Sequence, residues 1–129
     1  MPHFTVEYTA NLGDDARIPA LLTAVNQALL AQGGVYPVGG IRSRAVRVTE
    51  YAIADEAADY AFVHGVLTIG TGRSEDVKKR TGDAVFAVIK EHYREVQARR
   101  YLALSFELAE FNEAGTWKAN NLHQRFKPK

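Results

Sequence analysis

A switch between two hydrophobic periods, made twice along the chain, is the feature that most constrains the fold. Four segments alternate apolar and polar residues, which is typical of β-strands. They are residues 2–10, 44–50, 60–70 and 101–111. Within each half of the chain, the two strand candidates are separated by apolar residues that recur with helical spacing. The pattern predicts two consecutive β-α-β units.

The two predicted helices have recognisable starts. Pro19 is tolerated only in the first turn of a helix, so the first helix is expected to begin close to it. Asp14 or Asp15 would then cap that helix and favour its positive end. The second helix is predicted from about Glu75 to about Arg99.

These elements predict an α/β fold of the α+β two-layer sandwich type: a four-stranded sheet with two helices on one face. The 129 residues fit a single domain, residues 1–129, made of approximate halves 2–50 and 60–111 and a polar C-terminal tail, 112–129. The other face of the sheet would be bare, with Phe62 and Val66 on it beside His64. Such a patch predicts that another subunit covers it.

Composition narrows the classes of function. Sixteen Lys and Arg against fifteen Asp and Glu leave a net charge of +1, which does not indicate nucleic-acid binding. There is no cysteine, no apolar run long enough for a membrane span and no signal peptide, so a cytoplasmic location is expected. No metal is predicted, because His3, His64, His92 and His123 are dispersed without ligand spacing.

Pro2 is the first residue that points to chemistry. A small second residue allows removal of Met1, which would leave the proline nitrogen as a free secondary amine. An α-amine titrates near ~8, and burial beside cations lowers its pKa, so the amine would act as a base at neutral pH. The alternative is that Pro2 is simply a common second residue, and if Met1 is retained the base does not exist.

Three arginines are candidates for binding anions. Arg42 and Arg44 are two residues apart on a strand, so they share a face, and guanidinium groups pair with carboxylates bidentately. Arg73 lies in a Gly-x-Gly turn where Ser74 is the expected cap of the second helix, and a helix start favours anions. The alternatives are an exposed pair of arginines on a sheet edge and a plain helix cap.

Several short motifs together resemble one known family. They are Pro2-His3-Phe4 with Val6-Glu7-Tyr8 and Asn11, Gly39-Gly40-Ile41-Arg42-Ser43-Arg44, Asp59-Tyr60-Ala61-Phe62-Val63-His64, Ile69-Gly70 with Gly72-Arg73-Ser74, Leu102-Ala103-Leu104-Ser105-Phe106-Glu107, and Asn120-Asn121 with His123. In this the chain resembles the 5-carboxymethyl-2-hydroxymuconate isomerases of the tautomerase superfamily over nearly its whole length.

The resemblance implies a specific enzyme. Its members are homotrimers that ketonise 5-carboxymethyl-2-hydroxymuconate, a 2-hydroxy dienoate, to a 2-oxo-3-enoate in the breakdown of 4-hydroxyphenylacetate and homoprotocatechuate. They use no cofactor. By the same resemblance Pro2 is the general base and Arg42 the catalytic arginine that stabilises the developing charge. Arg44, Arg73 and Tyr36 are the candidates for binding the polycarboxylate substrate, with Tyr36 as an aromatic wall.

Two other functions remain open at this stage. A related tautomerase would use the same proline to decarboxylate or dehalogenate small unsaturated acids. A non-catalytic ligand-binding module of the same fold would leave Pro2 incidental, because fold alone does not decide function. Turnover of the dienol substrate separates both from the isomerase.

Overall fold

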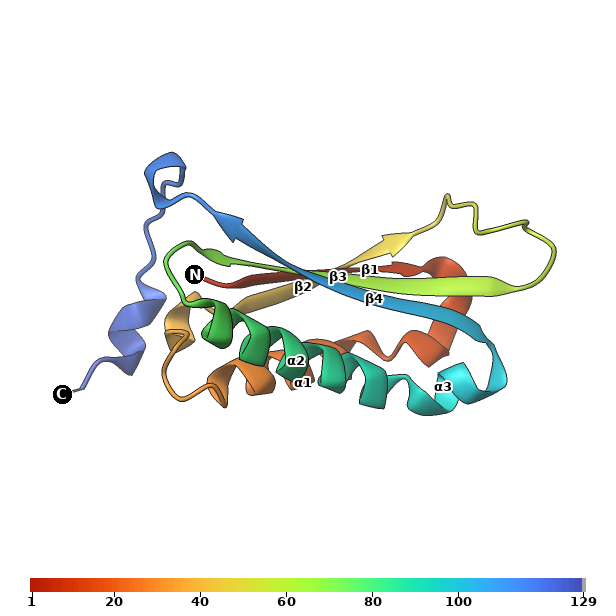
Figure 1. Cartoon of the computed structure of the whole chain (residues 1–129), viewed down its shortest axis with the longest axis horizontal. Helices are drawn as coiled ribbons and strands as arrows, with labels where there is room; N and C mark the ends of the chain where they lie inside the picture. The colour runs from red at the N-terminus through yellow and green to blue at the C-terminus, as the bar shows by residue number, and fades with distance from the viewer. Residues whose placement is uncertain (129) are drawn as a thin grey trace.

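The computed structural model describes residues 1–128. Within them, a four-stranded sheet carries its helices on one face, as the sequence predicts (Figure 1). In chain order the elements are β1 (His3–Thr9), α1 (Ile18–Leu30), β2 (Arg42–Val48), β3 (Tyr60–Gly70), α2 (Glu75–His92), α3 (Arg94–Arg99) and β4 (Tyr101–Phe111). Short 3-10 helices lie between and after them: η1 (Ala10–Ala16), η2 (Val38–Gly40), η3 (Glu113–Gly115) and η4 (Leu122–Phe126).

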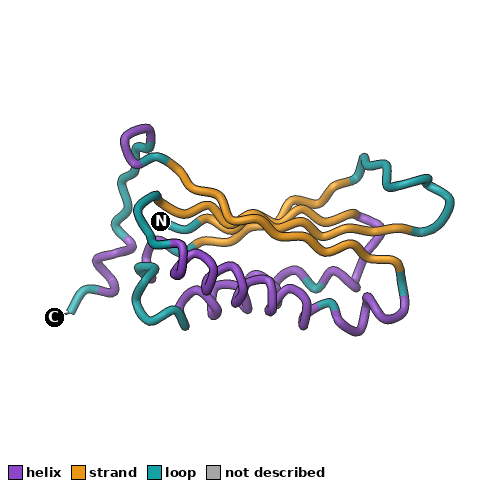
Figure 2. Tube along the Cα trace, in the orientation of Figure 1, coloured by secondary structure: helices purple, strands orange, loops and turns teal. Residues whose placement is uncertain are grey.

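The order of the strands across the sheet is β2-β1-β3-β4. β1 pairs in parallel with β2, and β3 with β4, because each pair is joined through a helix. β1 and β3 meet antiparallel in the middle. Each β-α-β unit therefore contributes one central and one edge strand, and both crossover helices lie on the same side (Figure 2).

The core lies between the sheet and the helices. The alternation predicted for the third strand is confirmed: Ala61, Val63, Leu67 and Ile69 are at most 1% exposed. Their partners on α1 and α2 follow the helical spacing, with Leu21, Val25, Leu29, Val85 and Ile89 buried. Within residues 1–128, no helix is both long and apolar enough to cross a membrane.

The second helix is interrupted, contrary to the prediction of one helix from Glu75 to Arg99. Its start is as expected, since the Ser74 hydroxyl accepts a hydrogen bond from the Val77 amide at 3.2 Å. The break falls at Tyr93, which leaves helical geometry between α2 and α3. Its side chain is fully buried and its hydroxyl donates to the Ala16 carbonyl at 2.6 Å, so packing against the first half sets the break.

The first helix begins at Ile18 with Pro19 in its first turn, so the start predicted from Pro19 is confirmed, but the predicted cap is wrong. Neither Asp14 nor Asp15 caps it, because residues 10–16 form η1 and Arg17 adopts a left-handed conformation before α1. Asp15 instead accepts hydrogen bonds from Arg99 and Arg100. Asp15, which was expected to cap the helix, thus links the two halves of the chain.

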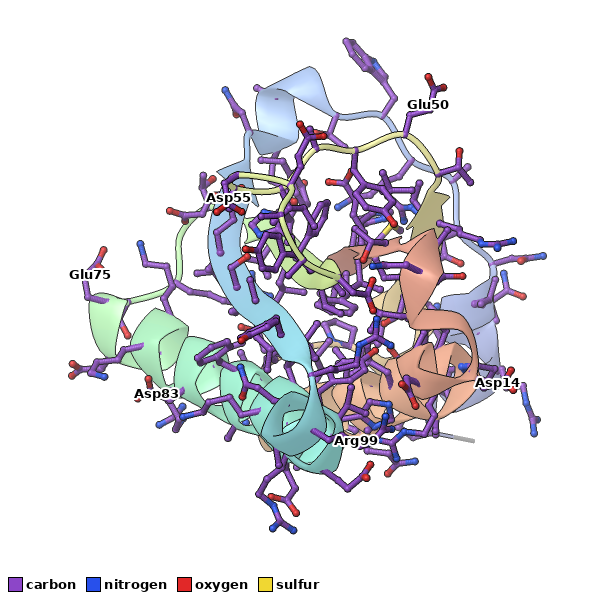
Figure 3. All side chains as sticks on the ribbon, turned by 90° about the vertical axis from the view of Figure 1, so that its right-hand side faces the viewer. Asp14, Glu50, Asp55, Glu75, Asp83 and Arg99 are labelled. Atoms are coloured by element: carbon purple, nitrogen blue, oxygen red, sulfur yellow. The ribbon has the colours of Figure 1, made fainter. Side chains whose placement is uncertain are left out.

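The second strand also differs, covering Arg42–Val48 rather than residues 44–50. Pairing begins at Arg42 because its amide donates to the Pro2 carbonyl at 3.2 Å. β2 then leads into a long loop, residues 49–59. Figure 3, seen along the sheet, places Glu50 and Asp55 of this loop on the opposite side of the molecule from Asp83 and Arg99 of the helical layer.

The sheet face opposite the helices is uncovered in the single chain (Figure 1). Phe62, His64 and Val66, which the sequence analysis predicted on this face, lie on it half-buried. The His64 Nδ1 lies 2.6 Å from the Ser105 hydroxyl, so part of this face is already paired.

Candidate active site

The candidate site lies at one end of the sheet, where β1 and β2 begin and β3 and β4 end (Figure 1). The amino terminus and the C-terminal tail meet at this end. Pro2 is buried there and enters β1, and the parallel register sets His3 opposite Arg42 and Thr5 opposite Arg44. Strand pairing therefore brings the predicted proline and both predicted β2 arginines to one place.

Two adjoining pockets flank Met1. One, of about 300 Å³, is lined by Arg44, Thr68 and Phe111 from the sheet. The other, of about 400 Å³, is lined by Arg42 and by residues 116–122 of the tail. Both are also lined by Met1, His3, Thr116 and Lys118. Met1 thus stands between two pockets that share four lining residues.

Arg42 and Arg44 lie on the same face of β2, as their spacing predicts, and each lines one pocket. The Arg44 guanidinium donates to His3 Nδ1 at 3.2 Å. Burial, then Arg44 and Arg42, hold the pKa of His3 below its ordinary value. A neutral His3 can accept the Arg44 hydrogen bond, so the imidazole orients the guanidinium toward the pocket.

The amino terminus is held in an environment that disfavours its charge. Burial is the main cause that lowers the pKa of the Met1 amine from its ordinary value of 8.0. Lys118, Arg73 and Arg42 lower it further by charge repulsion, and Glu113 opposes them. The Pro2 nitrogen is one residue further along the chain, and Pro2 is buried.

Arg73 contributes to this field but does not line either pocket. Its guanidinium donates to the carbonyls of Gly70 at 3.1 Å and Val35 at 3.2 Å. It also lies 4.7 Å over the centre of the Tyr36 ring. Within the single chain, Arg73 joins the loop after α1 to the end of β3.

Tyr36 lies in the core rather than at the pocket. It is 2% exposed, and its hydroxyl lies 2.7 Å from the hydroxyl of Thr81 on α2. The aromatic wall expected from the resemblance is therefore not at the pocket of this chain, because the ring is buried beneath Arg73.

The tail completes the site. A Cβ at Gly39 would lie only 2.8 Å from the His123 amide, and one at Gly40 would lie 3.3 Å from the Met1 Cα. The Asn120 side chain donates to the Gly39 carbonyl at 2.8 Å. The two glycines therefore let η4 and the amino terminus approach η2 closely, and the tail is packed on its own chain.

His3 and Lys118 are pocket residues that the sequence analysis did not single out. His3 alternates with Phe4 and pairs with Arg42, so strand periodicity combined with the β1–β2 pairing would have placed it. Lys118 comes from the polar tail, where no periodicity indicates which way a side chain points. Its position depends on the packing of η4 against η2.

Comparison of the sequence with known proteins points to one family. Residues 2–126 match the model of the family described as 5-carboxymethyl-2-hydroxymuconate isomerase. The chain is 42% identical over 127 residues to the 5-carboxymethyl-2-hydroxymuconate Delta-isomerase of Escherichia coli, covering 98% of this chain and all of that protein.

Solved structures extend the likeness to three dimensions. A 5-carboxymethyl-2-hydroxymuconate isomerase from Deinococcus radiodurans R1 has a TM-score of 0.94 at 55% identity, covering 98% of this chain and 95% of that one. A second structure named 5-carboxymethyl-2-hydroxymuconate delta-isomerase has a TM-score of 0.92 at 30% identity, covering 100% and 95%. More distant structures share the fold, including a fused 4-OT symmetric trimer at 15% identity, with a TM-score of 0.68, covering 91% of this chain and 93% of that one.

Proposed function

The chain belongs to the 5-carboxymethyl-2-hydroxymuconate isomerase family, and on that premise we propose that it ketonises 5-carboxymethyl-2-hydroxymuconate with the amine of Pro2 as its base. The observation that carries the proposal is the position of Pro2, which is buried and lies in the chain between Met1 and His3, two residues that line both the Arg42 pocket and the Arg44 pocket. An amine beside pockets that carry guanidinium groups suits a proton transfer on a polycarboxylate.

The reaction moves one proton and needs no cofactor. The Pro2 amine takes the proton of the 2-hydroxyl group, and the oxygen electrons form the 2-oxo group as both double bonds shift. The amine then returns the proton to the carbon at the far end of the former diene. Substrate and product have the same atoms, and the amine ends as it began.

The base requires the loss of Met1, since the proline nitrogen is otherwise an amide. Loss of Met1 would also remove the side chain that stands between the two pockets, so that one larger cavity would surround the amine. Burial and the neighbouring cations, which lower the pKa of the Met1 amine, would act on the Pro2 amine in the same direction.

The arginines divide the work of binding. Arg42 would bind a carboxylate and stabilise the charge that develops on the dienolate, and Arg44, oriented by His3, would bind a second carboxylate. Arg73 would act mainly through its charge on the amine. Tyr36 would support Arg73 from below, as its ring contact with the guanidinium suggests.

The working enzyme would be a homotrimer in the cytoplasm that acts in homoprotocatechuate breakdown. The uncovered sheet face of the single chain supports assembly. The fused 4-OT that shares the fold is a symmetric trimer. The absence of cysteine from the sequence suits a reducing compartment.

The test follows the ultraviolet absorbance of 5-carboxymethyl-2-hydroxymuconate as it ketonises. Protein shown by mass spectrometry to lack Met1 is expected to turn it over, and protein with a residue ahead of Pro2 is expected to be inactive. Pro2→Ala, which offers a weaker and more mobile primary amine, is expected to lose about 10²-fold or more in kcat. Because the amine must be unprotonated, the acidic limb of kcat/KM is expected below pH ~8.

Full activity with the proline nitrogen blocked would remove Pro2 from the mechanism while keeping the isomerase. No turnover by the trimmed protein would contradict the isomerase. Small unsaturated acids that undergo decarboxylation or dehalogenation would then be tried, followed by ligand binding without turnover.

A further inference from the structure

Lys118 is the tail residue that reaches both pockets around the amino terminus. It comes from the segment between η3 and η4, far along the chain from β1 and β2. After burial, its charge is the largest single cause that lowers the pKa of the Met1 amine, ahead of Arg73 and Arg42. Lys118 therefore both lines the two pockets and acts through its charge on the amino terminus.

Glu113 holds Lys118 in this position. The Lys118 Nζ lies 3.0 Å from Glu113 Oε2, and both side chains remain about half exposed, at 40% and 52%. The other oxygen of Glu113 lies 2.8 Å from the position that a Cβ on Gly70 would take, so the carboxylate packs against the end of β3. An exposed ion pair of this kind is weak and exchanges partners readily.

The other cations of the site leave one carboxylate of the substrate without a partner. The proposed substrate has three carboxylates, and Arg42 and Arg44 are the arginines that line the pockets. The Arg73 guanidinium already donates to two backbone carbonyls and stacks on Tyr36. The amine must be neutral to act as a base, so it cannot serve as the third cation.

We propose that Lys118 binds the carboxylate of the substrate's carboxymethyl arm, exchanging Glu113 for it as substrate enters. This inference rests on the proposed function. The arm is attached to the carbon that receives the proton. Because the amine delivers that proton, the carboxylate of the arm is held close to the amine. Lys118 is the cation that stands beside the amine in both pockets.

The experiment compares two substrates and three variants of the full-length trimmed enzyme. The substrates are 5-carboxymethyl-2-hydroxymuconate and 2-hydroxymuconate, which is the same dienol without the arm. The variants are Lys118→Gln, Lys118→Arg and Lys79→Gln. Lys79 is a matched control, because it forms an equally short exposed ion pair with Asp83 on α2, away from the pocket.

Lys118→Gln is expected to raise KM for the three-carboxylate substrate by roughly 10- to 100-fold, the loss of one charged hydrogen bond, and to change KM for 2-hydroxymuconate by less than about 3-fold. Assays are run above the acidic limb of every variant, because loss of the Lys118 charge is expected to move that limb to higher pH. Lys118→Arg is expected to restore most of the affinity. Lys79→Gln is expected to match the wild type.

Equal losses on both substrates would overturn the assignment of the arm and leave Lys118 as a general source of positive charge. An unchanged KM for both would remove Lys118 from binding. A wild-type enzyme that turns over neither dienol would instead overturn the proposed function, and this inference with it. Glu113→Gln gives a further check: by freeing Lys118, it is expected to lower KM for the three-carboxylate substrate alone.

Discussion

Gly39 is the residue at which the shape of the site depends on a single missing methyl group. The His123 backbone and side chain both lie within 3.0 Å of the place where a Cβ would stand. Contacts this short with backbone atoms require movement of the chain rather than of a side-chain end. The tail that carries Lys118 is held by this contact and by the hydrogen bond from Asn120.

Gly39→Ala is therefore expected to displace the tail from η2. Because residues 116–122 line a pocket, KM for the dienol substrate should rise several-fold or more, and limited proteolysis should cleave the tail faster. Both are measured on the purified protein, with mass spectrometry to locate the cuts.

Gly82→Ala is the matched control. A Cβ at Gly82 meets nothing within 4 Å, and the residue lies inside α2, so alanine should stabilise the fold by about 0.5–1 kcal/mol and leave KM unchanged. A Gly39→Ala protein with wild-type KM and wild-type resistance to protease would show that the tail does not need this close approach.

At the scale of the elements, the two β-α-β units are joined by polar contacts as well as by the shared core. Tyr36, in the loop after α1, meets Thr81 of α2 through their hydroxyl groups, and both side chains are buried. Arg73 packs on the outer side of the same ring. The contact therefore supports an arginine near the site from within the core.

Tyr36→Phe is expected to destabilise the protein by about 1–2 kcal/mol, because the buried Thr81 hydroxyl loses its partner. Thr81→Val should have a similar effect. The double variant should be more stable than the sum of the two losses implies, since it buries no unpaired hydroxyl. The measurement is urea unfolding at one fixed chain concentration.

Turnover separates a supporting role of Tyr36 from direct binding. The phenylalanine ring can still lie beneath Arg73, so kcat/KM is expected to stay within about 3-fold of wild type. A loss of 10-fold or more with unchanged stability would instead mean that the Tyr36 hydroxyl contacts substrate.

At the scale of the whole molecule, the outer sheet face is the surface through which we expect chains to assemble. Phe62, His64 and Val66 lie half-buried on it, and Val46 is 48% exposed at its β2 edge. Apolar side chains in the middle of a sheet are typical of a surface that another subunit covers. The proposed trimer would bury them.

Val66→Lys is expected to convert a trimer to single chains. Val66 pairs in register with Glu107, so a lysine at this position is tolerated in the isolated sheet but places a charge within a covered face. Analytical ultracentrifugation should give three chain masses for the wild type and one for the variant. Ala87→Lys, on the exposed side of α2, should remain trimeric.

A wild-type protein that sediments as a single chain would contradict the trimer. If Val66→Lys retains three chain masses, the contact between subunits does not involve this part of the sheet.

The regular elements were predictable because their signals are local. Side chains alternate along a strand whatever lies around it, so the strands at residues 60–70 and 101–111 and the buried faces of both halves follow from the residues in order. Pro19 and Ser74 marked the first turns of the helices for the same reason. Pro2 and Arg42 were proposed as site residues because they lie in motifs that the chain shares with the isomerase family.

Long-range contacts decided the remaining features. The interruption at Tyr93 depends on a hydrogen bond to Ala16, and the start of β2 at Arg42 depends on pairing with Pro2. The burial of Tyr36 and the presence of His3 and Lys118 in the pockets likewise depend on which segments pack together. A sequence pattern records the period of a backbone but not the distant partner of a side chain, and the site of this protein is assembled from such partners.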